Sequence, residues 1–382
     1  MYINFWYPLV RTQDLGAAPA KVTVLGQNLV VFRDSQGRAH CLANTCTHRG
    51  GNLAGGKVHG DCIACPYHGW QFNGAGECVK IPSLGPVDGV KGGKIPGRTR
   101  IDAYPVQEKY GIVFAFLGDL PEAERPPIYE IPEYGQDGWR ANEVMILDVD
   151  YNYERSIENG LDPAHNEFVH PTHGFSGEKD SYAVKPYDVV DNPLGCHFWM
   201  TFDSPALQDA TMNKVRNFDG DLKAGAGHYG PNCLQTWIHM TPTNWMHQYF
   251  FEAPVTESKT RIFFVNMRNC LLDPAHDAKI HERNLVIAKQ DIVVLTPLDP
   301  VVTPKDMTHE VMMPADRTVV RYRQLMKEWE AKGWRIDAEK VAATRTSTAY
   351  AIPSPGRRLH KGWVLDAVPT TVAPAAARQA AE

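Results

Sequence analysis

Short, mainly apolar runs, each closed by a turn sequence, dominate residues 20–120. The β-prone runs in this segment cover residues 21–25, 28–33, 39–43, 101–107 and 111–117. Gly26-Gln27 and Asp34-Ser35-Gln36-Gly37 separate the first three runs, and these residue types favour turns. The pattern predicts a β-rich N-terminal domain, to which we assign residues 1–120.

The pattern changes after residue 120. Residues 119–135 are rich in proline and acidic side chains and predict a linker. Helical patterns follow at residues 150–160, 276–295 and 321–332, and aromatic and β-branched runs lie at 195–203, 234–240, 246–254 and 260–268. We therefore expect a second domain with an antiparallel sheet over residues 121–368. An Ala/Pro/Thr-rich tail, residues 369–382, is expected to be disordered.

Composition limits the class of protein. The chain has 382 residues, 43% hydrophobic and 22% charged, with a net charge of −5 and a pI near 6.3. These values suit a two-domain globular enzyme and give no basic excess for binding nucleic acid or anionic membranes. No apolar run predicts a membrane-spanning helix, and the N-terminus lacks the features of a secretory leader. Eight cysteines do not make a disulfide scaffold in a chain this long, so we expect a reduced, cytoplasmic protein.

Two short motifs carry the clearest chemical signal. Cys46-Thr47-His48 and Cys65-Pro66-Tyr67-His68 supply two thiolates and two imidazoles, with sixteen residues between them. This mixed set is typical of a Rieske [2Fe–2S] cluster, in which one iron takes both cysteines and the other takes both histidines. The alternative is a structural zinc site, but the C-x-H half is uncommon there because zinc ligands are usually separated by two to four residues.

A second group of metal-binding residue types lies between residues 159 and 170. Asn159, Asp162, His165 and His170 form the pattern N-x-x-D-x-x-H-x-x-x-x-H. Two neutral imidazoles and one carboxylate are the set that holds Fe(II) and leaves positions open for O₂ and substrate. The histidines are five residues apart, so they do not share one face of a regular helix, and we expect the helix to end or distort near Pro171.

Together these motifs resemble the α subunits of the Rieske non-haem iron oxygenases. The likeness begins at Asn4-Phe5-Trp6-Tyr7-Pro8-Leu9 and is most specific in Cys46–Gly50 and Cys65–Trp70. The Rieske proteins of respiratory complexes are less similar, since they carry two extra cysteines where this chain has Gly51 and Tyr67. The resemblance implies an α+β fold, with an all-β Rieske [2Fe–2S] domain and a catalytic domain of the helix-grip kind built on an antiparallel sheet. The start of the chain resembles the homotrimeric branch of the family.

The resemblance also implies which residues bind metal. Cys46, His48, Cys65 and His68 would bind the cluster. His165 and His170 would bind a mononuclear Fe(II) together with an aspartate from a helix near the C-terminus. Asp291 matches that aspartate best, and Asp277 and Asp299 are weaker alternatives. An inward carboxylate without a partner is costly to bury, and a metal ion would remove that cost.

Other polar residues near these ligands have implied or open roles. The aspartate that Asp162 matches would accept hydrogen bonds from His68 of a neighbouring subunit and from His165 of its own, coupling the two centres. A helix or turn cap is the alternative for this aspartate before proline. Asn159 is interpreted as a polar neighbour of the iron or as a hydrogen-bonding residue inside the helix. His173 is interpreted as lying outside the site.

The resemblance implies the terminal oxygenase component of an electron-transfer system. It would use O₂ and electrons from an NAD(P)H-dependent reductase, with or without a ferredoxin, to hydroxylate, dihydroxylate or oxidatively dealkylate an aromatic or other hydrophobic small molecule. Gly225–Gly230 fits G-x-G-x-x-G but lacks the βαβ context of a dinucleotide site. His239 and His247 lie among aromatic residues and either line the substrate cavity or pack in the core. Two alternatives are an electron carrier of the Rieske type without oxygenation chemistry and a zinc-stabilised binding protein.

Overall fold

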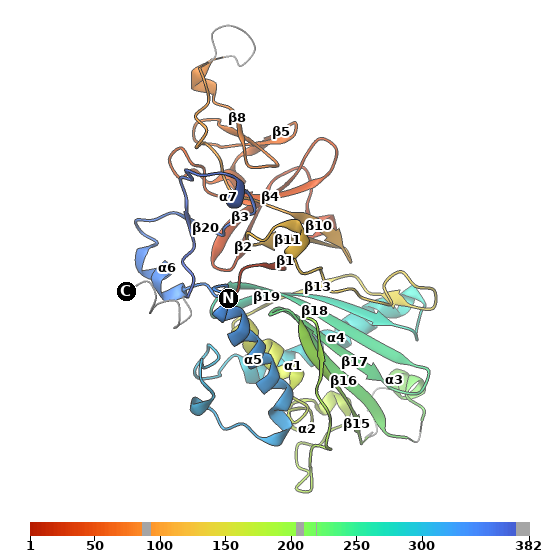
Figure 1. The fold of residues 1–382 in the computed structure, drawn as a ribbon. Coiled ribbons are helices and arrows are strands. Elements are labelled where there is room, and N and C mark those ends of the chain that lie inside the picture. Colours follow the sequence, from red (N-terminus) through yellow and green to blue (C-terminus); the bar gives the residue numbers. More distant parts are fainter. Residues whose placement is uncertain (86–92, 204–209, 219, 372–382) are drawn as a thin grey trace. The chain divides into compact units, whose positions relative to one another are not determined.

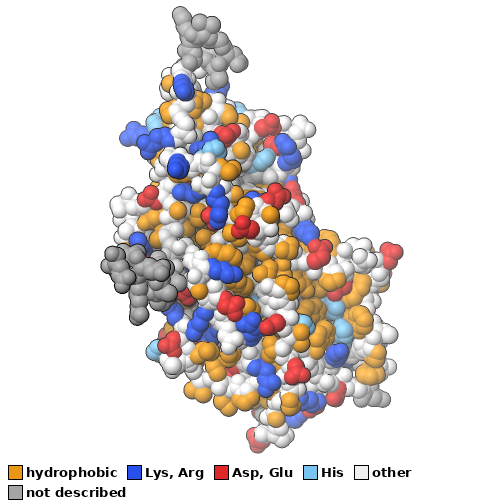
Figure 2. All heavy atoms as spheres, viewed as in Figure 1, with side chains coloured by type: hydrophobic (Ala, Val, Ile, Leu, Met, Phe, Trp, Pro, Cys, Tyr) orange, Lys and Arg blue, Asp and Glu red, His pale blue; other side chains and the backbone are white. Residues whose placement is uncertain are grey.

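The computed structural model describes residues 1–85, 93–203, 210–218 and 220–371. The chain forms two compact units: Met1–Ile128 with the chain from Trp329 onward, and Tyr129–Glu328. Figure 1 shows the sheets and helices of each unit. On the face seen in Figure 2, basic and acidic side chains are interspersed. Within the described ranges, no helix combines the length and the apolar character that crossing a bilayer requires.

The first unit is built from three small antiparallel sheets. Their strand orders are β1–β11–β10, β2–β3–β4–β9 and β5–β6–β7–β8. The strands are β1 (Phe5–Arg11), β2 (Ala20–Val24), β3 (Gln27–Arg33), β4 (Ala39–Ala43), β5 (Lys57–His59), β6 (Cys62–Ala64), β7 (Gln71–Asn73), β8 (Cys78–Lys80), β9 (Ala103–Tyr104), β10 (Val106–Lys109) and β11 (Ile112–Leu117). Val30 and Phe32 of β3 are fully buried in a core that includes the two motif cysteines, Cys46 and Cys65. The β-rich N-terminal domain is therefore confirmed, with its metal-binding motifs anchored in its core.

The C-terminal segment, from Trp329 onward, belongs to the first unit, whereas the sequence predicted that residues 121–368 form the second domain. It contains α6 (Ala338–Thr344), β20 (Tyr350–Ala351), α7 (Gly356–Leu359) and β21 (Asp366–Ala367). The cause is a buried carboxylate: Asp102 is 0% exposed, and Arg357 binds it through two hydrogen bonds of 2.7 Å. The first residues of the predicted tail are also bonded, since the amide of Asp337 donates to the carbonyl of Pro369 at 2.9 Å. The tail from residue 372 lies outside the described residues.

Replacing Arg357 by alanine is expected to destabilise the first unit by about 3 kcal/mol, because it leaves the Asp102 carboxylate buried without its counter-charge. Chemical denaturation followed through the visible absorption of the protein measures this loss. Arg358→Ala is the matched control: its side chain is 49% exposed and pairs with Asp119, so the expected cost is below about 1 kcal/mol. Equal stability of the two variants would contradict the anchoring role of Arg357.

The second unit contains an eight-stranded antiparallel sheet. Its order is β12–β19–β18–β17–β16–β15–β14, with β13 also paired to β19. The strands are β12 (Arg140–Ala141), β13 (Met145–Val149), β14 (Val190–Asn192), β15 (Gly195–Phe202), β16 (Leu222–Tyr229), β17 (Cys233–His239), β18 (Trp245–Thr256) and β19 (Lys259–Arg268). The four predicted strands of this domain are present as β15, β17, β18 and β19. Gly225–Gly230 lies in and just after β16, inside an antiparallel sheet, so its sequence does not form a dinucleotide-binding loop.

The helices of the second unit position the candidate ligands. They are α1 (Tyr153–Leu161), α2 (Asn166–Val169), α3 (Ala210–Val215), α4 (Asp277–Leu295) and α5 (Arg317–Ala331), which continues into the first unit. α1 begins where the Asn152 side chain accepts a hydrogen bond from the amide of Glu154, as an N-cap does. α4 packs Leu285, Ala288 and Ile292 against β13 and β19. The predicted α+β fold is confirmed.

Candidate metal centres and substrate cavity

Both cysteine–histidine motifs lie in loops closed by the same backbone hydrogen bonds. In the Cys46–Gly51 loop, the amide of Cys46 donates to the carbonyl of Gly51 at 2.9 Å, and the amide of Gly50 donates to the carbonyl of Cys46 at 3.0 Å. The Cys65–Trp70 loop repeats both bonds, at 2.7 Å and, from Gly69, at 2.9 Å. Gly50 and Gly69 have φ of +72° and +69°, a conformation that disfavours side chains. The sequence spacing thus produces two equivalent loops.

The loops bring two thiols and two imidazoles together. Cys46 and Cys65 are 1% and 3% exposed, whereas His48 and His68 lie at the surface with their Nδ1 atoms 3.1 Å apart. Burial raises the pKa of the Cys46 thiol to about 12, and the neighbouring Cys65 adds to the effect. The ring of His48 stacks on Trp70 at 4.5 Å. Sulfur donors on the inside and nitrogen donors on the outside fit a cluster with one cysteine-bound and one histidine-bound iron.

Gly51 keeps the space between the cysteines open. A Cβ at this position would lie 2.6 Å from Cys65 Sγ and 3.7 Å from Cys46 Cβ. No side chain can occupy that position without moving a cysteine. Gly51 therefore has a steric reason to be glycine.

Gly51→Ala is expected to lower cluster content about twofold or more, because forcing a methyl group into a tight site costs about 1–3 kcal/mol. Acid-labile sulfide per chain and the visible spectrum measure the content. Gly55→Ala is the control in the same inter-motif segment, since its Cβ would meet nothing closer than Asn52 Nδ2 at 3.5 Å. A fully loaded Gly51→Ala protein would contradict the steric account.

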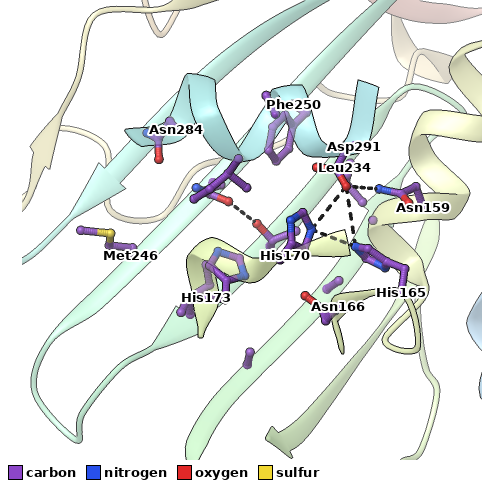
Figure 3. Close-up of a pocket in the computed structure, with 18 of the residues that line it drawn as sticks. Asn159, His165, Asn166, His170, His173, Leu234, Met246, Phe250, Asn284 and Asp291 are labelled. Atoms are coloured by element: carbon purple, nitrogen blue, oxygen red, sulfur yellow. Dashed lines mark hydrogen bonds and ion pairs between the residues drawn. The ribbon is translucent and has the colours of Figure 1, made fainter. Parts of the chain in front are cut away.

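The second candidate centre combines His165, His170 and Asp291. The Nε2 atoms of the histidines are 3.2 Å apart, and Asp291 Oδ1 lies 3.3 Å from His170 Nε2 and 3.8 Å from His165 Nε2. His165 and His170 flank the short helix α2, and Asp291 comes from α4. Figure 3 shows the three side chains turned toward one another. Among the described residues, they form the one group of three or more metal-ligating side chains whose donor atoms all lie within 4.8 Å.

Hydrogen bonds on the outer sides of these side chains fix their orientation. His165 Nδ1 donates to the backbone carbonyl of Asp162 at 2.6 Å, and His170 Nδ1 donates to Gln290 Oε1 at 3.0 Å. Asn159 Nδ2 donates to Asp291 Oδ1 at 3.0 Å. Both Nε2 atoms thereby keep their lone pairs toward the shared point, which is the arrangement that metal-binding histidines require.

Asp162 contacts His165 in a way that differs from the expected one. Its backbone carbonyl, not its carboxylate, accepts the hydrogen bond from the imidazole; the nearest carboxylate contact, Oδ2, is 3.9 Å from Nδ1. The other oxygen accepts from the amide of Ala164 at 2.7 Å, so the turn cap weighed as the alternative is present. The side chain is 26% exposed, and burial raises the pKa of this carboxyl.

The electrostatics of the two histidines differ. Burial lowers the pKa of His165, which favours the neutral imidazole that binds metals. Burial opposes a charge on His170 as well, but the Asp291 carboxylate and Gln290 outweigh it and raise the pKa. A metal ion bound by His170 and Asp291 would compete with protonation of this imidazole.

The weaker carboxylate alternatives lie elsewhere. Asp277 begins α4 and pairs with Arg140 and Arg268, whose guanidinium groups help to lower its pKa to about 2. Asp299 is exposed in the loop after α4. Neither belongs to the group of donors around His165 and His170.

His173 lies closer to the site than expected. It is not one of the three grouped donors, but its ring lies 4.9 Å from the ring of His170, and it lines the same cavity. Burial, together with the charges of His170 and Arg283, lowers its pKa well below the usual value. His173 is thus outside the group of donor side chains, as interpreted, but it forms part of the cavity wall.

His239 and His247 lie on the opposite face of the sheet from this cavity. Side chains alternate along a strand, and the lining residues Thr236 and Ile238 of β17 leave His239 facing away. His247 Nδ1 instead binds the Glu133 carboxylate, which also accepts from Tyr249 at 2.8 Å. Of the two alternatives weighed for this histidine pair, packing is therefore correct.

The cavity beside the triad is mainly apolar. Aromatic and aliphatic side chains from the sheet line it, among them Phe198, Leu234, Ile238, Met246, Phe250 and Phe264. Polar lining comes from Thr236, Gln248 and Asn284, and charged lining includes Arg216 and Arg283. Such a cavity suits a hydrophobic molecule with few polar groups.

Several of these residues were missed in the sequence. Gln290 and the Asp162 carbonyl orient the histidines, and Arg216 and Arg283 bring charge into the cavity. One sequence feature could have indicated Gln290: it is a polar residue directly before Asp291, the single inward acid predicted on this core helix. A backbone carbonyl carries no sequence signal, and the arginines are far apart along the chain.

Comparison with known proteins gives two family matches. The profile described as the Rieske [2Fe–2S] domain matches residues 5–96, and that described as the vanillate O-demethylase oxygenase C-terminal domain matches residues 149–332. Solved structures share the fold at 22% identity. Pseudomonas putida NdmA with caffeine has a TM-score of 0.72 and covers 86% of this chain and 91% of its own. Dicamba monooxygenase bound to 3,6-dichlorosalicylic acid has a TM-score of 0.70, covering 85% and 96%.

Curated relatives extend the likeness to the sequence. The chain is 33% identical over 229 residues to the 3-chlorobenzoate-3,4-dioxygenase oxygenase subunit of Comamonas testosteroni, covering 56% of this chain and 50% of that subunit. It thus spans about half the length of that relative. The iron–sulfur subunit of the toluene-4-sulfonate monooxygenase system of the same species is 36% identical over 309 residues, covering 75% of this chain and 85% of that subunit. This similarity over most of both chains, together with the two family profiles, shows that the chain belongs to the Rieske non-haem iron oxygenases.

Proposed function

We propose that the chain is a terminal oxygenase component that hydroxylates, dihydroxylates or oxidatively dealkylates an aromatic or other hydrophobic small molecule with O₂. The observation that carries the proposal is the His165, His170 and Asp291 group at one side of an apolar cavity, in a chain that also holds the paired cysteine–histidine loops. An electron carrier needs the loops but has no use for a second metal centre with a cavity beside it.

The ligand assignment follows from the donor atoms. Cys46, His48, Cys65 and His68 hold the [2Fe–2S] cluster in this proposal. His165, His170 and Asp291 hold the mononuclear Fe(II). When bound, the cluster supplies single electrons, and the ferrous ion binds and reduces O₂ beside the substrate.

The protein's own side chains prepare this chemistry. Gln290 and the Asp162 carbonyl fix the tautomers of His170 and His165, and Asn159 holds the Asp291 carboxylate in place. The apolar wall binds the substrate and excludes water from the reacting centre. The three triad residues line the same cavity.

The proposal includes partners and assembly. The partly exposed Asp162 carboxylate would accept a hydrogen bond from the exposed His68 of a neighbouring copy in a homotrimer, linking a cluster to an iron of the next chain. A ferredoxin or an NAD(P)H-dependent reductase would dock where His48 and His68 reach solvent. A cytoplasmic location is supported by the six cysteines outside the cluster loops, which form no disulfide, since reducing compartments keep cysteines in this form.

Oxygen consumption tests the proposal. The protein loaded with both metals is reduced anaerobically, mixed with O₂ and a panel of aromatic, heterocyclic and steroidal compounds, and the products are identified by mass. Oxygen incorporation or loss of an alkyl group from at least one compound is expected. Reoxidation of the cluster without change in any compound would favour an electron carrier instead.

A further inference from the structure

The face of the large sheet that points away from the cavity carries a second pair of converging imidazoles. His239 lies on β17 and His247 on β18, two neighbouring strands in Figure 1. Trp245 is directly opposite His239 in the strand register, so the two histidines are diagonal neighbours on one face. Their Nε2 atoms are 3.2 Å apart. His247 is 7% exposed and His239 is half-buried, so the pair lies at the edge of a packed aromatic surface.

The geometry of this pair repeats that of the triad histidines. In the triad, the two Nε2 atoms are 3.2 Å apart and the ring centres 5.1 Å apart. For His239 and His247, the corresponding distances are 3.2 Å and 5.3 Å. Two imidazole nitrogens that bind one tetrahedral ion at about 2.0–2.1 Å lie about 3.3–3.4 Å apart. The pair is therefore already spaced to share one ion.

A buried carboxylate holds the outer nitrogen of His247. Glu133 accepts a hydrogen bond from His247 Nδ1 and another from the Tyr249 hydroxyl at 2.8 Å. Burial opposes ionisation of Glu133, but these two hydrogen bonds outweigh it and lower the pKa of the carboxyl. An ionised carboxylate on Nδ1 leaves the lone pair on Nε2, directed toward His239, and makes the imidazole a stronger metal ligand.

His239 is neutral and held in place by aromatic rings. Burial, together with the nearby His247 and Lys223, lowers the pKa of His239 to about 4. Protons therefore do not compete for this imidazole in neutral buffer. Its ring stacks on Trp245 at 4.4 Å with an angle of 13° between the planes, and it also contacts Trp199 at 4.9 Å. A ligand that is already oriented loses little freedom when it binds an ion.

We propose that His239 and His247 bind a divalent cation of the zinc type on this outer face of the sheet, separate from the oxygenase centre. Imidazole nitrogen is a preferred donor for such ions. Within the described parts of the chain, three or more His, Cys, Asp or Glu donors converge only at the triad, so water completes the coordination of the new site. The next residues along the two strands, Ile238 and Met246, line the substrate cavity, so a bound cation cross-links two strands of the cavity wall.

Zinc binding to the full-length, iron-loaded protein tests the inference. Equilibrium dialysis against buffered Zn²⁺ under anaerobic conditions gives the zinc and iron contents per chain, and calorimetry gives the affinity. Uptake of one Zn²⁺ per chain with unchanged iron is expected. Glu133→Gln keeps an oxygen acceptor for His247 but loses the charge, and should weaken binding about 10- to 100-fold, as loss of a partner behind a ligand does. His239→Gln removes a ligand and should weaken binding more.

His197→Gln is the matched control. His197 lies on β15, on the same face of the sheet, and its ring packs against Trp237 at 6.1 Å. It is not part of the facing pair, so its loss should leave the zinc affinity unchanged. His239 is chosen for the main substitution because it is half-buried, whereas His247 is buried on Glu133. The visible absorption of the cluster and the iron content establish that each variant is folded and loaded.

Three outcomes would overturn the inference. Absence of zinc uptake would mean that the two rings only share a hydrogen bond, in which His239 Nε2 donates to His247 Nε2. Zinc uptake matched by an equal loss of iron would place the zinc at the triad. Full zinc affinity in His239→Gln would place it elsewhere on the surface. Each of these results leaves the proposed oxygenase function unaffected, because that function depends on the triad and the cluster loops alone.

Discussion

Replacing His165 by alanine is expected to remove the mononuclear iron and all oxygenation while the cluster remains intact. His165 Nε2 lies 3.2 Å from His170 Nε2 at the shared point, and two remaining donors hold Fe(II) weakly. Iron content should fall from about three to about two per chain, because the cluster keeps its two. Metal analysis, acid-labile sulfide and the visible spectrum of one preparation give the result.

His173→Ala is the control for this substitution. His173 is a neighbouring cavity histidine outside the triad, so its loss should leave the iron content unchanged even if it alters substrate binding. Bleaching of the cluster in His165→Ala would show that the two centres are not separate. Iron loss in both variants would mean that the donor set has been assigned wrongly.

The cluster loops could be predicted from sequence because their ligands are local. Each loop contains its cysteine, its histidine and the glycine that closes it within six residues, as in Cys46–Gly51. The steric role of Gly51 could not be predicted in this way, because it depends on a contact with Cys65 in the other loop. The spacing of cysteines and histidines in the sequence identifies the donor residues. How closely the two loops approach each other can be seen only in the folded structure.

The triad shows the same limit over a longer distance. His165 and His170 could be recognised from their spacing, but the resemblance to known oxygenases was needed to choose among three aspartates. Packing of α4 decides the choice physically: it turns Asp291 toward the histidines, and it leaves Asp277 at the start of the helix with two arginines. Periodicity alone does not distinguish an inward acid that binds metal from one that forms a salt bridge.

One of the missed strands, β16, and the C-terminal segment assigned to the wrong unit have physical explanations. β16 has the sequence LKAGAGHY, and glycine and alanine are poor strand formers. Its small residues are required there, since a Cβ on Gly225 would lie 2.5 Å from the carbonyl oxygen of Phe198. The chain after Trp329 joins the first unit through Arg357 and Asp102, a contact between residues 255 positions apart that no local pattern encodes.

Asp162→Asn is expected to reduce turnover about 100-fold while both metal centres stay loaded. Iron retention follows from the geometry: His165 is held by the backbone carbonyl of Asp162, which the substitution does not change. The asparagine side-chain oxygen can still accept from the amide of Ala164, so the local turn is preserved as well. What disappears is the negative charge of a partly exposed carboxylate, which we propose links His165 to His68 of the next chain.

The effect of losing this charge is measured by the rate of cluster reoxidation in a single turnover with O₂ and substrate. This rate reports electron transfer between the centres in protein whose metal content has been determined separately. Asp180→Asn, at an exposed aspartate away from the triad, should react like the unmodified protein. Full turnover in Asp162→Asn would remove the linking role. Loss of iron would instead mean that the carboxylate, and not the carbonyl, orients His165. Slow reoxidation with both centres loaded would support the linking role. A purely structural role of Asp162 does not explain that result, because a structural defect at Asp162 would also disturb the iron ligand His165 and lower the iron content.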